Sequence, residues 1–256
     1  MDCGVEYGFK IIQYIYDMRY HGGKTRAGKK ISTVIQDIID DNESSIKGYC
    51  EPFCGACGVL SHLTHNRNLN FLAGDKNGSM IEMWTRMQEG WEPDIRHMDS
   101  DYYEKLKWDG EISAQKGFIG HVMSYGGIYF QAYCEDLVDR LPSAKKNVMD
   151  RCDKLRNVAF SCGDYSMYSE LTNYVIFCDP PYEKLSRYYD ENNVRMTFDS
   201  DTFWAWCKMM SEKNIVIVNE MSTKLSEHEY NRVELVPRSI GYKKSDKHVE
   251  YLYVIL

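Results

Sequence analysis

The residues best suited to chemistry are Asp179, Pro180, Pro181 and Tyr182, which directly follow the apolar segment YVIFC. Two successive prolines end a strand and fix the backbone, which leaves main-chain carbonyls that no sheet partner uses. This set matches a planar amine, because Asp179 and the Pro180 carbonyl can accept its two N–H bonds while Tyr182 stacks on its ring. The alternative is a Pro-Pro turn with a capping aspartate.

A second candidate is the stretch EPFCGACG, residues 51–58, which is typical of a turn between a strand and a helix. Small residues let a ligand approach the backbone there, and a helix N-terminus behind the turn favours negative charge. Asp75 follows about 20 residues later, where an acid commonly holds the ribose hydroxyls of an adenosine ligand. A plain turn aspartate is the alternative for Asp75.

Four motifs in one order resemble the Dam-like class (D12 class, group alpha) of DNA adenine-N6 methyltransferases. Family members typically show a GGK element, an EPFxGxG turn, an (N/A)DIN strand end and a DPPY. The matching segments here are Tyr20-His21-Gly22-Gly23-Lys24, Glu51 to Gly58, Gly74-Asp75-Lys76-Asn77 and Asp179 to Tyr182. The resemblance spans nearly the whole chain except about 90–150. Two positions depart from it, because Cys57 replaces the second glycine of the turn and Tyr20 replaces the tryptophan before GGK.

The resemblance implies that the chain binds S-adenosyl-L-methionine and no metal. Tyr20 and Lys24 would contact the methionine end of this cofactor, Phe53 and Gly55 would line its methyl-sulfonium side, and Asp75 would hold its ribose. Asp164 would lie near its adenine. The full set expected at the cofactor is Tyr20, Gly23, Lys24, Glu51, Phe53, Gly55, Asp75, Asp164 and Asp179.

The implied reaction is methyl transfer to the exocyclic N6 of an adenine flipped out of duplex DNA at a specific site. Asp179, Pro180 and Tyr182 would hold this base as the catalytic residues. N6 is a poor nucleophile because its lone pair is delocalised into the ring, so acceptors at Asp179 and Pro180 would raise lone-pair density toward the methyl group. Alignment and desolvation would supply most of the remaining rate. The alternatives are an RNA adenine-N6 methyltransferase and a catalytically silent DNA-binding relative.

Strands and helices alternate along most of the chain. Apolar periodicity predicts helices over 9–20, 31–40, 79–88 and 201–212. Strands are expected from Gly48 onward and within 68–77, 157–165, 173–182, 214–220 and 249–256. This rhythm predicts an α/β fold with a largely parallel sheet, whose ligands bind at the carboxyl ends of the strands. With the resemblance, it indicates a Rossmann-like S-adenosylmethionine-dependent methyltransferase fold.

The alternation of strand and helix patterns stops between about Gly90 and Asp150, where the segments DSDYYEKLKWDG and MSYGGIYFQAY lie. We therefore expect a target-recognition insertion over 91–150 within a catalytic domain formed by 1–90 and 151–256. Basic residues in and beyond this region are candidates for DNA phosphate contacts, although two solvated faces are the alternative. They are Lys145, Lys146, Arg151, Lys154 and Arg156, then Lys243, Lys244 and Lys247.

The composition fits a globular protein of 256 residues with 43% hydrophobic and 27% charged residues. There is no long apolar run and no apolar core behind a charged start, which argues against a membrane span and a secretory signal. Nine scattered cysteines suit reduced thiols, so we expect a cytoplasmic protein of a prokaryotic cell or of a phage or viral host cell. A net charge of −7 does not indicate nucleic-acid binding by itself, but a total charge says little about one face. The expected partner is duplex DNA, with a cognate restriction endonuclease as a possible second one.

Two other motifs could indicate a phosphate-binding loop or a zinc site. Gly23-Lys24-Thr25 resembles a phosphate-binding loop, but the first glycine of that motif is Met18 here and the preceding segment is expected to be a helix rather than a strand. Cys54 and Cys57 form a CxxC without a second CxxC or a histidine pair at finger spacing, which does not favour zinc.

Overall fold

The computed structural model describes residues 18, 20–24, 27–64, 68–181, 197–220, 231–234, 238–239, 247–248 and 251–255. Most of the helix predicted over 9–20 lies outside these residues. Tyr182, Lys243 and Lys244 lie outside them as well.

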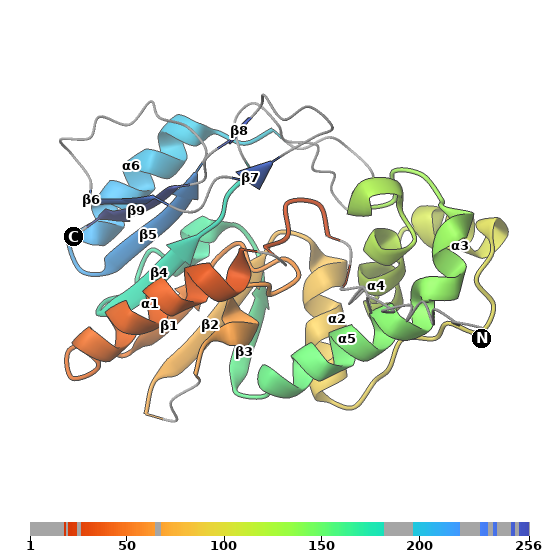
Figure 1. The fold of residues 1–256 in the computed structure, drawn as a ribbon, viewed down its shortest axis with the longest axis horizontal. Helices are drawn as coiled ribbons and strands as arrows, with labels where there is room; N and C mark the ends of the chain where they lie inside the picture. The colour runs from red at the N-terminus through yellow and green to blue at the C-terminus, as the bar shows by residue number, and fades with distance from the viewer. Residues whose placement is uncertain are drawn as a thin grey trace, which may run out of the picture.

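A seven-stranded sheet with the order β3-β2-β1-β4-β5-β9-β6 forms the centre of the molecule (Figure 1). Its strands are β1 (Gly48–Glu51), β2 (Asn70–Asp75), β3 (Val158–Cys162), β4 (Tyr174–Cys178), β5 (Ile215–Glu220), β6 (Asn231–Glu234) and β9 (Tyr251–Ile255). The strands β1 to β5 are parallel, whereas β9 runs antiparallel to both β5 and β6. The predicted Rossmann-like α/β fold is confirmed, and the order reverses between β1 and β4, where such folds bind ligands.

The strands in the middle of the sheet are buried because both of their faces are covered. Every residue of β1 and of β4 is buried. A continuous apolar strand such as β4 is characteristic of parallel sheets with helices on both sides. A separate pair, β7 (Arg238–Ser239) and β8 (Lys247–His248), forms a short antiparallel ribbon.

Six α-helices flank the sheet or extend beyond its β3 edge in the described part of the chain. They are α1 (Gly28–Asn42), α2 (Gly78–Gln88), α3 (Ser100–Trp108), α4 (Ala114–Val122), α5 (Leu141–Lys154) and α6 (Ser200–Ser211). Short 3-10 turns cover Leu60–His62, Tyr125–Gly127, Glu135–Arg140 and Tyr165–Tyr168. The three helices predicted within the described residues are confirmed. None of the described helices is long and apolar enough to cross a membrane.

Residues 91–150 contain α3, α4 and most of α5, and they lie beside α2 (Figure 1). The contact between α4 and α2 is close, because a Cβ added at Gly117 would lie 2.1 Å from the Ser79 carbonyl oxygen. Trp84 of α2, Tyr103 of α3 and Phe118 of α4 belong to one continuous core. The division into a catalytic domain and a target-recognition insertion stays a prediction.

Candidate active site

A cavity of about 310 Å³ lies at the carboxyl ends of the parallel strands. Small-molecule sites commonly have volumes of roughly 300–1,000 Å³. The residues predicted at the cofactor all line this cavity: Tyr20, Gly23, Lys24, Glu51, Phe53, Gly55, Asp75, Asp164 and Asp179. Pro180 is buried and does not line it, but its neighbour Pro181 does. The structure thus brings four motifs that are distant in sequence to one cavity, while Tyr182 lies outside the described residues.

Asp75 holds the turn that follows β1. Its Oδ2 accepts a hydrogen bond from the Gly55 main-chain N–H at 2.9 Å, and its Oδ1 accepts one from the Asn77 N–H, also at 2.9 Å. Burial raises the pKa of Asp75 above its ordinary value, against these backbone hydrogen bonds, which lower it. Asn77 in turn caps α2, since its Oδ1 accepts from the Met80 N–H at 3.0 Å. Asp75 and Asn77 therefore set the geometry of this cavity wall, whatever ligand it takes.

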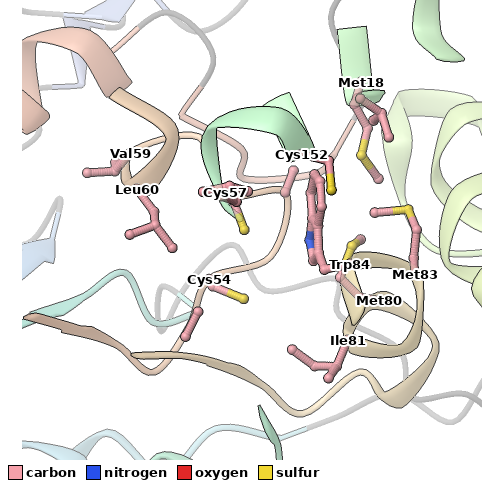
Figure 2. Packing of buried hydrophobic residues seen from close by; sticks show 14 of the residues in the cluster. Met18, Cys54, Cys57, Val59, Leu60, Met80, Ile81, Met83, Trp84 and Cys152 are labelled. Carbon is pink, nitrogen blue, oxygen red and sulfur yellow. The ribbon is translucent and has the colours of Figure 1, made fainter. Parts of the chain in front are cut away.

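The same turn is held from behind by two side chains of the helical layer. The Trp84 indole Nε1 donates to the Gly55 carbonyl at 2.9 Å, and Arg151 Nη1 donates to the Ala56 carbonyl at 2.6 Å. Figure 2 shows Trp84 of α2 packed in the same cluster as Cys54 and Cys57. The sequence predicts Arg151 as a candidate for DNA phosphate contact, which stays a prediction; in the structure its guanidinium supports the turn.

The backbone of this turn favours glycine at two positions, and buried packing accommodates Cys57 at one of them. Gly55 has φ +43°, and a Cβ added there would lie 2.7 Å from the Tyr20 ring. Cys57 has φ +54°, in the left-handed region that favours glycine. A non-glycine residue in this region costs of order 1–3 kcal/mol and persists where its surroundings hold it in place. The fully buried Cys57 side chain supplies that packing.

Asp179 sits between two buried donors. Lys24 Nζ lies 2.8 Å from Asp179 Oδ1, and Asn219 Nδ2 donates to the same oxygen at 3.0 Å. The Lys24 side chain is only 4% exposed, so this ion pair is shielded from solvent. Sequence reasoning missed Asn219 as a site residue. Its signal is a polar amide at the end of the apolar run IVIV, on the strand next to β4.

Glu51 is a buried carboxyl group in the cavity wall. Its pKa is raised to about 8, chiefly by burial, with the Asp179 carboxylate adding to the rise. The Tyr49 hydroxyl donates to Glu51 Oε2 at 2.9 Å, and the Leu60 backbone N–H also bonds to it; both lower the pKa. Glu51 therefore binds its proton far more tightly than an ordinary glutamate does.

Aromatic rings form another part of the wall. Phe53 stacks on Tyr165 with ring centroids 5.6 Å apart and meets Phe198 edge-on at 6.0 Å. All three residues line the cavity, and Tyr165 and Phe198 were not predicted to do so. Such rings offer flat faces to a planar heterocycle.

Residues 91–150 also contribute to the wall, through His121, Ile128 and Tyr129. Sequence reasoning assigned this region to DNA alone, because nothing in its irregular pattern places a side chain beside the GGK element. Within the described residues, no group of three or more His, Cys, Asp or Glu side chains could hold a metal ion.

Comparison with known proteins bears on the same elements. Residues 20–121 match the family model of the D12 class N6 adenine-specific DNA methyltransferases. The match begins at Tyr20, includes Lys24, the turn after β1 and Asp75, and ends at His121. It therefore includes most of the residues that line the cavity, but not Asp164, Tyr165 or the Asp179 segment. No curated protein matches the chain in sequence.

Three solved structures resemble the chain weakly. A conserved hypothetical protein of Streptococcus pyogenes has 11% identity and a TM-score of 0.35, over 86% of this chain and 94% of that one. A Thermoplasma acidophilum protein has 10% identity and a TM-score of 0.34, over 88% and 87%. An Escherichia coli protein described as a candidate methyltransferase has 9% identity and a TM-score of 0.31, over 87% and 84%. Similarity at this level carries no argument about function.

Proposed function

We propose that this chain is an S-adenosyl-L-methionine-dependent DNA methyltransferase that acts on N6 of an adenine flipped out of the duplex at a specific site. The observation that carries the proposal is the ion pair between Lys24 and Asp179 at 2.8 Å. This ion pair joins the GGK element, which lies inside the matched family region, to the DPPY element, which lies outside it. Glu51 and Asp75 line the same cavity.

The cavity residues suit S-adenosyl-L-methionine. The turn at Gly55 would admit the cofactor close to the backbone, and Asp75 would accept hydrogen bonds from its ribose hydroxyls. Phe53 and Tyr165 offer ring faces, and the acidic groups of the wall would offset its positive sulfur. When bound, the cofactor would supply the activated methyl group.

The protein groups would act mainly by orientation. Lys24 and Asn219 fix the Asp179 carboxylate before any base arrives, so accepting a hydrogen bond from an amine requires little reorganisation. Asp179 and the Pro180 carbonyl would accept the two N–H bonds of the adenine amino group, and Tyr182 would stack on the base. Extruding the base costs a few kcal/mol, which contacts to the DNA backbone must offset.

We assign the DNA contact to residues 91–150 and to the basic side chains of α5. Lys145 Nζ lies 2.9 Å from Glu92 Oε2, and Lys146 pairs with Asp150. Lys146 and Asp150 are both exposed, and Lys145, although partly buried, pairs with an exposed glutamate. Solvent-accessible pairs of this kind contribute little to stability, so either lysine can exchange its carboxylate for a phosphate.

The test is methylation of nucleic acids in parallel. Purified protein is incubated with S-adenosyl-L-methionine and either genomic DNA lacking adenine methylation or total RNA, and the nucleosides are then analysed by mass spectrometry. The proposal expects N6-methyl-2′-deoxyadenosine from the DNA. Methylation of the RNA alone would establish the RNA alternative, and no methylation of either would overturn the proposal.

A further inference from the structure

A buried junction connects the Tyr20–Lys24 segment to the helical region 91–150. The Gly127 carbonyl accepts a hydrogen bond from the His21 main-chain N–H at 3.0 Å and another from the His121 ring, whose Nδ1 is also at 3.0 Å. The His121 ring packs against Tyr20 with centroids 4.6 Å apart and against Tyr129 at 5.0 Å. One histidine thus touches both the GGK element and the turn beyond α4.

The chemistry of the carbonyl fixes the state of His121. A carbonyl oxygen only accepts, so Nδ1 must carry the proton. Burial lowers the pKa of His121 to about 4, against the Gly127 hydrogen bond, which raises it. His121 is therefore neutral near pH 7, with Nε2 unprotonated. That nitrogen is buried and makes no hydrogen bond among the described residues.

Tyr20 contacts both His121 and two sides of the cavity. On one side its ring lies so close to Gly55 that an added Cβ would be 2.7 Å away. On the other, the Tyr20 carbonyl accepts from the Gly23 N–H at 3.0 Å, which shapes the turn that delivers Lys24 to Asp179. A shift of Tyr20 would therefore disturb the two walls together.

We propose that His121 is a positioning residue that fastens the Tyr20–Lys24 segment to region 91–150 and so holds the cofactor wall in its binding geometry. The proposal rests on the proposed function for the identity of the ligand. His121 acts through Tyr20 and Gly127, by a ring contact and a hydrogen bond, and takes no chemical part in methyl transfer.

Three variants separate the two contacts. His121→Ala removes both. His121→Asn keeps an amide donor at the place of Nδ1 and loses the ring, whereas His121→Phe keeps a ring and loses the donor. The Phe variant keeps a ring and leaves no unsatisfied Nε2, so it tests the hydrogen bond to Gly127.

Tyr103→Phe is the matched control. The Tyr103 hydroxyl lies 2.6 Å from the Ser124 hydroxyl, buried in the same helical region, and Tyr103 does not line the cavity. This control removes a buried hydrogen bond of region 91–150 without touching the junction.

The measurement is calorimetric titration with S-adenosylhomocysteine, together with hydrogen exchange of the peptide that contains the His21 amide. His121→Ala should weaken binding about tenfold to thirtyfold, since a hydrogen bond and a ring contact are each worth roughly 1 kcal/mol. The Asn and Phe variants should each restore part of the affinity, and the Tyr103→Phe protein should bind within about twofold of the parent. The His21 amide should exchange faster in the Ala variant than in the parent.

Parental affinity in His121→Ala would overturn the proposal. An equal loss in Tyr103→Phe would do so too, since the effect would then be a general loss of stability. Should the Ala variant fail to fold, the Asn and Phe variants decide by the same two readouts. A parent protein that does not bind S-adenosylhomocysteine would contradict the proposed function, whereas unchanged His21 exchange in the variants would contradict the positioning role by itself.

Discussion

The sharpest stability prediction concerns the buried carboxyl group of Glu51, which Glu51→Gln makes permanently neutral. The pKa of this group is about 8 in the folded chain, against an ordinary value of 4.5. The folded state therefore retains a proton that the unfolded state releases between these two values. The stability that Glu51 contributes is fully present below pH 4.5 and is lost as the pH rises through about 8.

The size of the effect follows from the difference of 3.5 between the two pKa values. At about 1.36 kcal/mol for each pKa unit, the full effect is about 5 kcal/mol, of which about 4 kcal/mol falls between pH 5 and pH 9 because the unfolded glutamate already releases part of its proton below pH 5. The free energy of unfolding of the parent should fall by this amount relative to Glu51→Gln. Taking the difference between the two proteins cancels the other titrating groups, including His121.

Urea denaturation at several pH values between 5 and 9 measures this difference. The control is Glu111→Gln, which neutralises an exposed acid in the loop before α4. Its curve should run parallel to that of the parent, whereas the curve of Glu51→Gln should diverge upward as the pH rises. Parallel curves for all three proteins would refute the assignment of a raised pKa to Glu51.

Three further changes test other parts of the site. Asp75→Asn has one carboxamide oxygen and cannot accept hydrogen bonds from both the Gly55 and Asn77 amides, so it loses a charge-assisted bond worth roughly 1.5–3 kcal/mol. By calorimetry, S-adenosylhomocysteine should bind this variant at least about tenfold more weakly than the parent. Affinity within twofold of the parent would contradict this prediction. Trp84→Phe leaves the buried Gly55 carbonyl without its donor and should lower the free energy of unfolding by about 1–3 kcal/mol in urea, so a change below about 0.5 kcal/mol would remove Trp84 from its supporting role. Replacing Lys145 and Lys146 with Ala should weaken binding to unrelated duplexes about equally and reduce the slope of log K against log salt by about 2 in a fluorescence titration; a loss confined to one sequence would show that these lysines read bases.

The sequence predicts those cavity residues that follow a buried strand. Glu51, Asp75 and Asp179 each stand at or just after the end of a buried parallel strand, and such ends meet at one edge of a sheet. The periodicity of the strands therefore places these acids together before any coordinates are known. The order of the motifs adds the GGK element to the same site.

The remaining contacts depend on long-range packing that local patterns do not encode. Lys24 and Asp179 are far apart in sequence, and only the folded chain shows that they form an ion pair. His121 and Tyr129 reach the cavity because α4 packs against α2 through Gly117, and spacing in an irregular region indicates no such face. The edge strand β6 was missed because its four residues, NRVE, contain no continuous apolar run.

The proposed reaction requires Asp179 to act on the target amine, and single-turnover methylation of duplex DNA with Asp179→Ala measures this role. The control is Asp201→Ala, which removes an exposed acid from α6. We expect a folded Asp179→Ala protein that binds duplex DNA nearly as well as the parent, because phosphate contacts supply most of the affinity. Its rate should fall at least about a hundredfold, the cost of losing a preorganised group worth roughly 3 kcal/mol in the transition state. Formation of N6-methyladenine by this variant at the parental rate would show that Asp179 does not act on the amine.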